Sequence, residues 1–389
     1  MGRLLMKLSL WFAIVLIQTY GYKGCLEKER IGLLEFKSFI KSVNLYDKEE
    51  IFISWVDDKT SDCCGWERVK CNAATGRVIE LSLNSSVQFN KFGYLTLNLS
   101  LFHPFDELLI LDLSSNFFQD CQENKVYDGF RSLKRLKFLD LAFNFFNASL
   151  LPCLNTLTSL TTLNLGSNSM GEGLTLAKKG LANLTNLKTL YLRHNLVSQG
   201  FTNLTGLEVL DLGENEINGC PSSLGLANLT NLKTLYLDYS QINCSLASQG
   251  FANLKSLEIL DLGFNGINGS LSSSGICELK NLVEVDLRRN NFDGQLPKCL
   301  TNLTYLKVLV LSSNQLNGYL PPSIGDMKSL EYLDLRENNF EGLFSLSSLA
   351  NQSKLEEVYL LGSTNIQVYV YFFWQAMTYD IIFPINYVD

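Results

Sequence analysis

Few side chains in this sequence have types and spacing that could support catalysis or metal binding. The two histidines, His103 and His194, offer little material for a metal site or a proton relay. Cys63, Cys64 and Cys71 could bind zinc, but they lack a nearby histidine and the usual CxxC spacing. The sequence also contains no phosphate-binding glycine loop, kinase catalytic-loop pattern or HExxH motif. We therefore predict no enzyme activity, no metal site and no cofactor.

Recognition is the chemistry that other residues favour. Aromatic and charged side chains flank the leucines of short "LxL" segments, so they would face solvent if the leucines are buried. Exposed tyrosine and arginine are favoured at binding hot spots. The predicted ligand-binding residues are Tyr191, Arg193, His194, Tyr236, Asp238, Tyr239, Phe264, Arg288, Arg289 and Arg336. The alternative is an ordinary solvated surface, and the aspartate that recurs inside "LDL" is expected to be structural.

A repeated pattern, "LxxLxxLxLxxN", must position these side chains. The spacing of its final asparagine ranges from 20 residues (Asn195 to Asn215) to 28 residues (Asn116 to Asn144). One repeat cannot bury its own leucines, so successive repeats must stack into a solenoid with a short strand in each. The asparagine side chain can both donate and accept hydrogen bonds between neighbouring turns. The asparagines are Asn116, Asn144, Asn168, Asn195, Asn215, Asn265, Asn290, Asn314 and Asn338, with Ser240 and Ser363 in the same position of two further copies.

Part of the array is duplicated almost literally. The thirteen residues Gly180–Leu192 recur as Gly225–Leu237, 45 positions later. The match continues through "SQGF", at 198–201 and 248–251, where the offset is 50. The duplicated unit is therefore two repeats, and its first copy is five residues shorter. We expect this deletion on the connecting side of the repeat, because surface loops tolerate length changes.

Two further features identify a family resemblance. A "GxLP" motif follows the asparagine at Gly294–Pro297 and Gly318–Pro321, and a block from Cys25 to "DCCGWERVKC" precedes the first repeat. With these features, roughly residues 25–350 resemble the ectodomain of plant leucine-rich-repeat receptor-like proteins. The resemblance implies an α/β solenoid, a right-handed superhelix with a parallel concave β-sheet and a disulfide-bonded helical N-terminal cap. The predicted domains are a signal peptide (1–24), the cap (25–76), about eleven repeats (77–363) and an atypical aromatic tail (364–389).

Helical spacing of apolar residues over 26–41 predicts the cap helix, and Trp55 and Trp66 are expected to pack in the cap core. The resemblance implies disulfides between Cys25 and Cys63 and between Cys64 and Cys71. Cys220 and Cys244 follow the asparagine position of consecutive repeats by five and four residues, so stacked strands would bring them within bonding distance. Neighbouring repeats also suggest Cys277–Cys299 and Cys121–Cys153, with free buried thiols as the alternative.

The N-terminus has the pattern of a secretory signal peptide. Arg3 and Lys7 precede the apolar run Leu8–Ile17, and the small residues Thr19 and Gly21 follow. The alternatives are a buried helix or a membrane anchor, but this run is too short to span a bilayer.

The C-terminal end fits the array poorly. The apolar stretch after Ser363 is interrupted by Gln375, Asp380 and Pro384, so it predicts no membrane helix. Residues 368–374 could instead form a makeshift cap over the last repeat. We favour truncation of a longer receptor-like protein.

In a secreted chain the N-x-[ST] sequons become credible glycosylation sites, although "NLT" is also part of the repeat. Four of them share one repeat position and would place glycans in rows on an outer flank: Asn183, Asn203, Asn228 and Asn302. The other predicted sites are Asn84, Asn98, Asn147, Asn243, Asn268 and Asn351.

The formal charge of −7 disfavours nucleic acid as a partner. The resemblance implies an extracellular module that binds a peptide or protein on the concave face and signals through a partner kinase in plant defence or development. Full-length members sit in the plasma membrane. Two alternatives stay open: a freely secreted binder or inhibitor similar to polygalacturonase inhibitors, and a non-functional truncated product.

Overall fold

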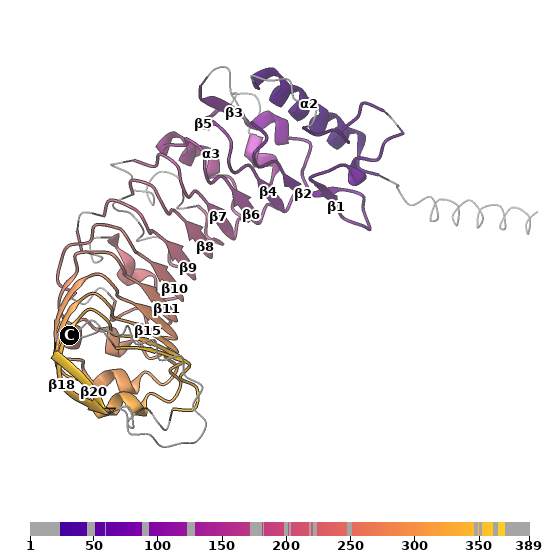
Figure 1. Cartoon of the computed structure of the whole chain (residues 1–389). Helices are drawn as coiled ribbons and strands as arrows, with labels where there is room; N and C mark the ends of the chain where they lie inside the picture. The colour runs from indigo at the N-terminus through magenta and orange to yellow at the C-terminus, as the bar shows by residue number, and fades with distance from the viewer. Residues whose placement is uncertain are drawn as a thin grey trace, which may run out of the picture. The chain divides into compact units, whose positions relative to one another are not determined.

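The computed structural model divides the chain into two units, residues 1–145 with 156–160 and residues 146–155 with 161–389. It describes residues 24–44, 51–58, 60–87, 93–122, 129–171, 181, 183–197, 201, 204–217, 219–220, 224–246, 251–345, 349, 352–360 and 365–369. The predicted signal peptide, apart from Gly24, and the predicted tail, apart from Asn365–Tyr369, lie outside these residues. Figure 1 draws the chain coloured from its N-terminus to its C-terminus.

Helix α2 (Glu27–Val43) forms the N-terminal cap of the first unit. It buries Leu33, Phe36 and Ile40, which lie three and four residues apart on one helix face, as the sequence pattern predicts. Phe36 packs against Phe102 with 6.2 Å between ring centroids, so the helix covers the first repeats of the array.

Aromatic packing completes the cap core. The Trp55 and Trp66 rings stack with centroids 6.0 Å apart, and Phe52 stacks on Trp55 at 4.1 Å. Both tryptophans are buried, which confirms the packing role predicted for them. The Trp55 indole N–H also donates to the Glu67 carbonyl at 2.8 Å, so its polar group is satisfied.

Parallel strands of three to five residues build the rest of the first unit. The cap strand β1 (Val69–Cys71) pairs antiparallel with β2 (Val78–Ser82), whose other edge pairs in parallel with β4 (Ile110–Asp112). Strand β6 (Phe138–Asp140) follows β4 in parallel, and β3 (Leu95–Asn98) pairs with β5 (Phe118–Gln122) in a separate sheet. The antiparallel cap strand thus protects an otherwise open sheet edge.

A long parallel sheet dominates the second unit, where its strands lie on the inner side of the curved stack (Figure 1). Every strand buries the central leucine or valine of its repeat. Joined side by side, these residues form the continuous core that no single repeat could make alone. The strands are β7 (Thr162–Asn164), β8 (Thr189–Tyr191), β9 (Val209–Asp211), β10 (Thr234–Tyr236), β11 (Ile259–Asp261), β13 (Glu284–Asp286), β15 (Val308–Val310), β17 (Tyr332–Asp334) and β19 (Glu357–Tyr359).

A second parallel sheet in this unit is not anticipated by the sequence analysis. Three of its strands start directly after the asparagines Asn290, Asn314 and Asn338, and the sheet includes the "GxLP" glycines: Gly294 and Gly318 both have φ 74°. A side chain strains this left-handed backbone, which is the physical reason for glycine in the motif. The strands are β12 (Asn268–Ser270), β14 (Asn291–Gly294), β16 (Gln315–Tyr319), β18 (Asn339–Ser345) and β20 (Asn365–Tyr369).

Strand β20 lies within the segment predicted as an atypical tail. It pairs in parallel with β18 over five residues, from Asn365 opposite Glu341 to Tyr369 opposite Ser345. This short part of the predicted tail therefore extends the second sheet.

Short helices complete the coils. Their side chains point inward in the same way as the strand leucines, for example Leu150 and Leu226, which are both buried. They are η1 (Cys63–Gly65), η2 (Leu99–Phe102), η3 (Gly129–Ser132), η4 (Ala148–Leu150), α3 (Leu151–Leu154), η6 (Leu226–Asn228), η7 (Leu271–Ser273), η8 (Ile276–Glu278), η9 (Lys298–Asn302) and η10 (Pro322–Asp326).

The asparagine ladder predicted from the repeat is present. The Asn195 amide nitrogen donates to the carbonyl of Leu165 in the preceding repeat at 2.9 Å and to that of Leu192 in its own repeat at 3.1 Å. Its Oδ1 accepts from the Met170 amide at 3.0 Å. One buried side chain thus satisfies backbone groups of two adjacent coils where the chain leaves the strand.

Disulfides join the expected cysteines. The bonded pairs are Cys25–Cys63, Cys64–Cys71, Cys220–Cys244 and Cys277–Cys299. Cys121 and Cys153 are also each disulfide-bonded. Among the described residues no cysteine is a free thiol.

The sequons of described residues differ in exposure. Asn183, Asn228 and Asn302, which share the repeat position expected on the outer flank, are exposed, as are Asn243 and Asn268. The remaining described sequons, at Asn84, Asn98 and Asn147, are half-buried. Asn203 and Asn351 lie outside the described residues, and glycosylation of every site stays a prediction.

Candidate functional site

The ten predicted ligand-binding residues occupy three rows on the solvent side of the long sheet. We number each segment xLxLxxN from one to seven, so that Thr189 to Asn195 form one segment. Because the strands pair in register, equal positions of successive segments lie side by side. Position three holds Tyr191 and Tyr236, position five holds Arg193, Asp238, Arg288 and Arg336, and position six holds His194, Tyr239, Phe264 and Arg289.

The aspartates at position three are structural, as predicted. The Asp211 carboxylate accepts a hydrogen bond from the Gly213 amide at 3.0 Å, and Asp334 accepts one from the Arg336 amide at 3.1 Å. Asn164 occupies the same position in β7 and makes the same bond to the Gly166 amide at 3.0 Å. This interaction holds the backbone as it leaves the strand, so it needs an oxygen acceptor rather than a charge.

Arg193 crosses the face to a carboxylate two repeats away. Its guanidinium bonds Asp238 with both Nη atoms, at 2.9 and 2.5 Å, and its Nε donates to Glu214 at 3.0 Å. Gly213 lies between Arg193 and Asp238, and a Cβ atom there would overlap the Arg193 guanidinium. The glycine therefore leaves room for a bidentate ion pair that ties three repeats together.

Position six has a left-handed backbone in each segment from 189 to 338. For example, φ is 55° at His194, 52° at Tyr239 and 56° at Phe264. This conformation is unfavourable for residues with a side chain, but the amide at position six donates to a carbonyl of the next repeat, as Tyr239 does to Gly263 at 3.0 Å. We infer that these hydrogen bonds and the buried asparagine at position seven hold the left-handed turn.

The position-six side chains meet their neighbours along one edge of the sheet. His194 Nδ1 lies 3.0 Å from Glu214 Oε2, and this hydrogen bond lowers the pKa of Glu214. The Tyr239 and Phe264 rings are stacked, with centroids 4.0 Å apart and planes 14° apart. The Arg289 guanidinium carbon lies 5.1 Å from the Phe264 ring centroid. We call Tyr239, Phe264 and Arg289 the edge stack.

The two other predicted arginines are neutralised within the chain. Arg288 forms an ion pair with Asp286, and its Nε donates to that carboxylate at 2.6 Å. Arg336 binds Asp334 through Nε and Nη2 at 2.9 and 2.8 Å. The Arg336 guanidinium also lies 4.4 Å from the Tyr359 ring centroid.

Asp261 is the most strongly perturbed carboxyl of this face. Burial raises its pKa to about 7, and the neighbouring charges of Asp286 and Asp238 act in the same direction. The Gly263 amide and Arg288 partly oppose the shift. Asp211 has its pKa raised by the same main cause, burial of its carboxyl group.

This shift predicts a stability change with pH. The folded chain holds the Asp261 proton up to about pH 7, whereas the unfolded chain loses it near the ordinary value of 3.8. The free energy of unfolding should therefore fall as pH rises between these values. Asp261→Asn should remove this slope and stabilise the protein at pH 8 by about 1 to 2 kcal/mol, as each pKa unit corresponds to about 1.4 kcal/mol before the discount for partial exposure.

Urea denaturation of both proteins at pH 4 and pH 8 checks this prediction. Asn164 shows that an amide can make the required hydrogen bond, so the variant should fold. Asp326→Asn changes an exposed carboxylate away from the sheet face and serves as the control. Equal destabilisation of Asp261→Asn at both pH values would contradict the assignment.

The structure thus places six of the ten predicted ligand-binding residues in two groups. Arg193, His194 and Asp238 belong to one ion-pair network, while Tyr239 joins Phe264 and Arg289. Tyr191 and Tyr236 flank Asp211 on neighbouring strands in register. Sequence reasoning missed the role of Gly213. The signal was a glycine at position five between two segments that carry Arg193 and Asp238, opposite charges, at the same position.

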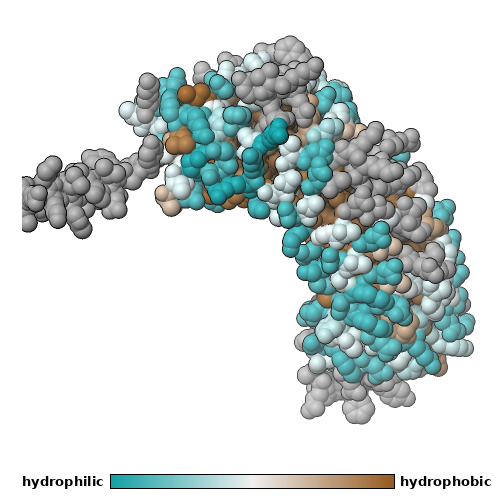
Figure 2. All heavy atoms as spheres, turned by 180° about the vertical axis from the view of Figure 1, so that it is seen from behind, coloured by the Kyte–Doolittle hydropathy of each residue, from teal (hydrophilic) through white to brown (hydrophobic). Residues whose placement is uncertain are grey.

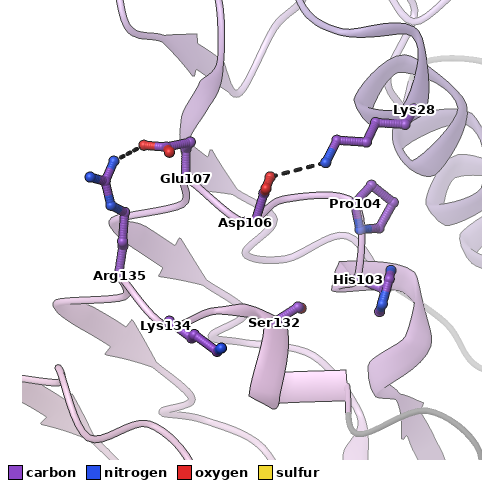
Figure 3. Close-up of a pocket in the computed structure, with 8 residues that line it drawn as sticks. All are labelled: Lys28, His103, Pro104, Asp106, Glu107, Ser132, Lys134 and Arg135. Atoms are coloured by element: carbon purple, nitrogen blue, oxygen red, sulfur yellow. Dashed lines mark hydrogen bonds and ion pairs between the residues drawn. The ribbon is translucent and has the colours of Figure 1, made fainter.

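A pocket of about 520 Å³ lies in the first unit, lined by residues of the cap helix and the first repeats (Figure 3). At its rim Lys28 bonds Asp106 at 3.2 Å, and Arg135 pairs with Glu107. Its acidic groups are therefore committed to neighbouring cations. On the face drawn in Figure 2 the described residues are mostly hydrophilic, and hydrophobic residues are visible only in small areas.

Neither a metal centre nor a membrane-spanning helix is found within the part of the chain that the structure describes. No group of three or more His, Cys, Asp or Glu side chains in these residues could hold a metal ion. No helix in these residues is long and apolar enough to cross a bilayer.

Comparison with known proteins agrees with this architecture. Residues 26–72 match the leucine rich repeat N-terminal domain family, and residues 280–340 match the leucine rich repeat family. The chain is 41% identical over 362 residues to receptor-like protein 14 of Arabidopsis thaliana, and 39% identical over 367 residues to receptor-like protein 8 of the same plant. The chain has a leucine-rich-repeat fold, and its sequence is similar to plant receptor-like proteins.

These alignments cover 92% and 93% of the leucine-rich-repeat chain but only 34% and 31% of the relatives. The chain therefore spans about a third of the length of these curated relatives. Among solved structures, the plant peptide hormone receptor RGFR1 in complex with RGF2 superposes with a TM-score of 0.59 and 26% identity, covering 78% of this chain and 45% of the receptor. The fold is thus a leucine-rich-repeat solenoid similar to that of this solved receptor.

Proposed function

We propose that this leucine-rich-repeat protein recognises a peptide or protein ligand on the solvent face of its long sheet, outside the cell, and acts through a partner kinase. The observation that carries the proposal is the arrangement of Tyr236, Tyr239, Phe264 and Arg289 on three successive segments of the same face, where an extended ligand could contact several repeats together. Tyrosine and arginine are enriched among binding hot spots, and anchors that the fold already holds in place lose less entropy on binding.

The relatives support this proposal. The similar solved receptor is described as a complex with a peptide hormone, and the curated relatives are receptor-like proteins. The kinase is inferred from the resemblance to receptor-like proteins.

A paired substitution tests the binding face. Random peptides of about twelve residues, displayed on phage, are selected on the immobilised protein, and the dissociation constants of the selected peptides are measured for variants. Tyr236→Ala combined with Tyr239→Ala should weaken binding at least about tenfold, because two anchors are lost. Tyr305→Ala is the control, since Tyr305 is 61% exposed and lies off the sheet face. Peptides that bind the double variant as tightly as the parent would refute binding on this face.

A further inference from the structure

We propose that the edge stack of Tyr239, Phe264 and Arg289 selects a ligand segment carrying an acidic side chain and an apolar side chain about three residues apart. The acidic group would bind the Arg289 guanidinium, and the apolar group would pack on Tyr239. This inference rests on the proposed function, which it narrows to one chemical class of peptide.

Arg289 differs from the other predicted arginines in having no acidic partner. Arg193 is held by Asp238 and Glu214, and the other two, Arg288 and Arg336, are each held by an aspartate of their own segment. A ligand carboxylate would have to compete with these internal acids. Among the described residues, no hydrogen bond or ion pair engages the Arg289 guanidinium, which is exposed. Its charge is therefore available to an incoming anion.

The aromatic rings prepare this cation for binding. The guanidinium lies over the Phe264 ring, and the opposite face of that ring is covered by Tyr239. An arginine stacked on an aromatic ring keeps the N–H groups at its edge free to bind a carboxylate in a bidentate manner. Holding the side chain in place before binding also reduces the entropy lost in the complex.

The geometry of the sheet sets the spacing in the ligand. Tyr239 and Arg289 belong to segments two strands apart, which corresponds to about 9.6 Å at about 4.8 Å per strand. An extended peptide advances about 3.3 Å per residue, so about three residues cover this distance. Tyr239 is 49% exposed and offers the apolar contact surface at one end of this span.

The same phage selection tests the inference by its sequence preference. Peptides selected on the parent protein should be enriched in aspartate or glutamate about three residues from an aromatic or aliphatic residue. Their binding should weaken at least about tenfold with Arg289→Gln and less with Arg289→Lys, because lysine keeps the charge but loses the planar fork. Lys298→Gln removes an exposed charge from helix η9, away from the sheet face, and should leave binding unchanged.

The outcomes separate this inference from the proposed function. Peptides that require Tyr236 and Tyr239 but show no acidic preference, or that bind Arg289→Gln like the parent, would overturn the inference and leave the proposed binding face intact. Peptides indifferent to all of these substitutions, or a selection that yields no binders, would overturn both. Circular dichroism of Arg289→Gln checks that the variant is folded, and the Arg289→Lys series gives an independent comparison.

Discussion

Replacing Asn290 with alanine is expected to lower the free energy of unfolding by about 3 to 5 kcal/mol. The Asn290 amide nitrogen donates to the carbonyls of Leu262 and Leu287 at 2.8 and 3.1 Å, and Oδ1 accepts from the Ile267 amide at 3.0 Å. Alanine would leave these backbone groups without partners, and a buried unsatisfied group costs about 1 to 3 kcal/mol. Chemical denaturation followed by circular dichroism measures the loss.

Two further substitutions sharpen the Asn290 experiment. Asn281→Ala removes an exposed asparagine whose amide donates to the Lys255 carbonyl at 2.9 Å, and it should cost less than about 1 kcal/mol. The loss of unfolding free energy for Asn290→Ser should lie between those of Asn290→Ala and Asn281→Ala. Ser240 occupies the asparagine position of another repeat and donates to the Leu212 carbonyl at 2.9 Å, so a serine can replace part of the hydrogen bonding. A cost for Asn290→Ala as small as that for Asn281→Ala would show that the ladder contributes little.

The location of the destabilised region is a second measurable consequence of Asn290→Ala. Stability in a repeat array is approximately a sum of repeat and neighbour terms, so a local defect acts mainly on adjacent coils. Hydrogen exchange should therefore accelerate most in strands β11 and β13, which flank the affected turn, and least in distant strands of the same unit.

Arg193→Ala has the second-largest expected effect, a loss of about 2 to 4 kcal/mol. The Asp238 side chain is only 10% exposed, and Arg193 supplies both hydrogen bonds of its bidentate ion pair. Removing one partner of a largely buried pair leaves an uncompensated charge, which costs more than the pair itself contributes. The partial exposure of Arg193 places the expected value below that of a fully buried pair.

Three comparisons identify the origin of the Arg193 effect. Lys255→Ala breaks an exposed ion pair with Glu278 and should cost less than about 1 kcal/mol. Gly213→Ala keeps both charges but adds a Cβ that overlaps the Arg193–Asp238 pair, so it should also destabilise the protein. Adding Asp238→Asn to Arg193→Ala should recover part of the lost free energy of unfolding, because the double variant no longer buries an unpaired carboxylate. If the double variant is no more stable than Arg193→Ala, the destabilisation comes from lost packing of the arginine side chain rather than from an unpaired charge.

Repeat spacing alone predicts much of this architecture. The alternation of leucine with polar residues in "TLYL" and "VLDL" identifies the buried and exposed sides of each strand, because strand side chains alternate in direction. The asparagine at position seven likewise predicts the ladder, since only a side chain that donates and accepts can serve two coils. Helical spacing in the cap predicts which face of α2 is buried. The sequence by itself thus determines the repeating coil, its core and the residues displayed on the strand face.

Only the tertiary structure decides which displayed residues are available for binding. Arg193, Arg288 and Arg289 look alike in the sequence, yet the first two are held by aspartates and the third lies on an aromatic ring. The second sheet and the left-handed turn at position six also arise from hydrogen bonds between adjacent coils. Asp286 lies two residues before Arg288, but the partners of Arg193 and Arg289 lie one or two repeats away, at separations of about 20 to 45 residues. Stacking brings them together in three dimensions, so local sequence patterns carry no direct signal for them.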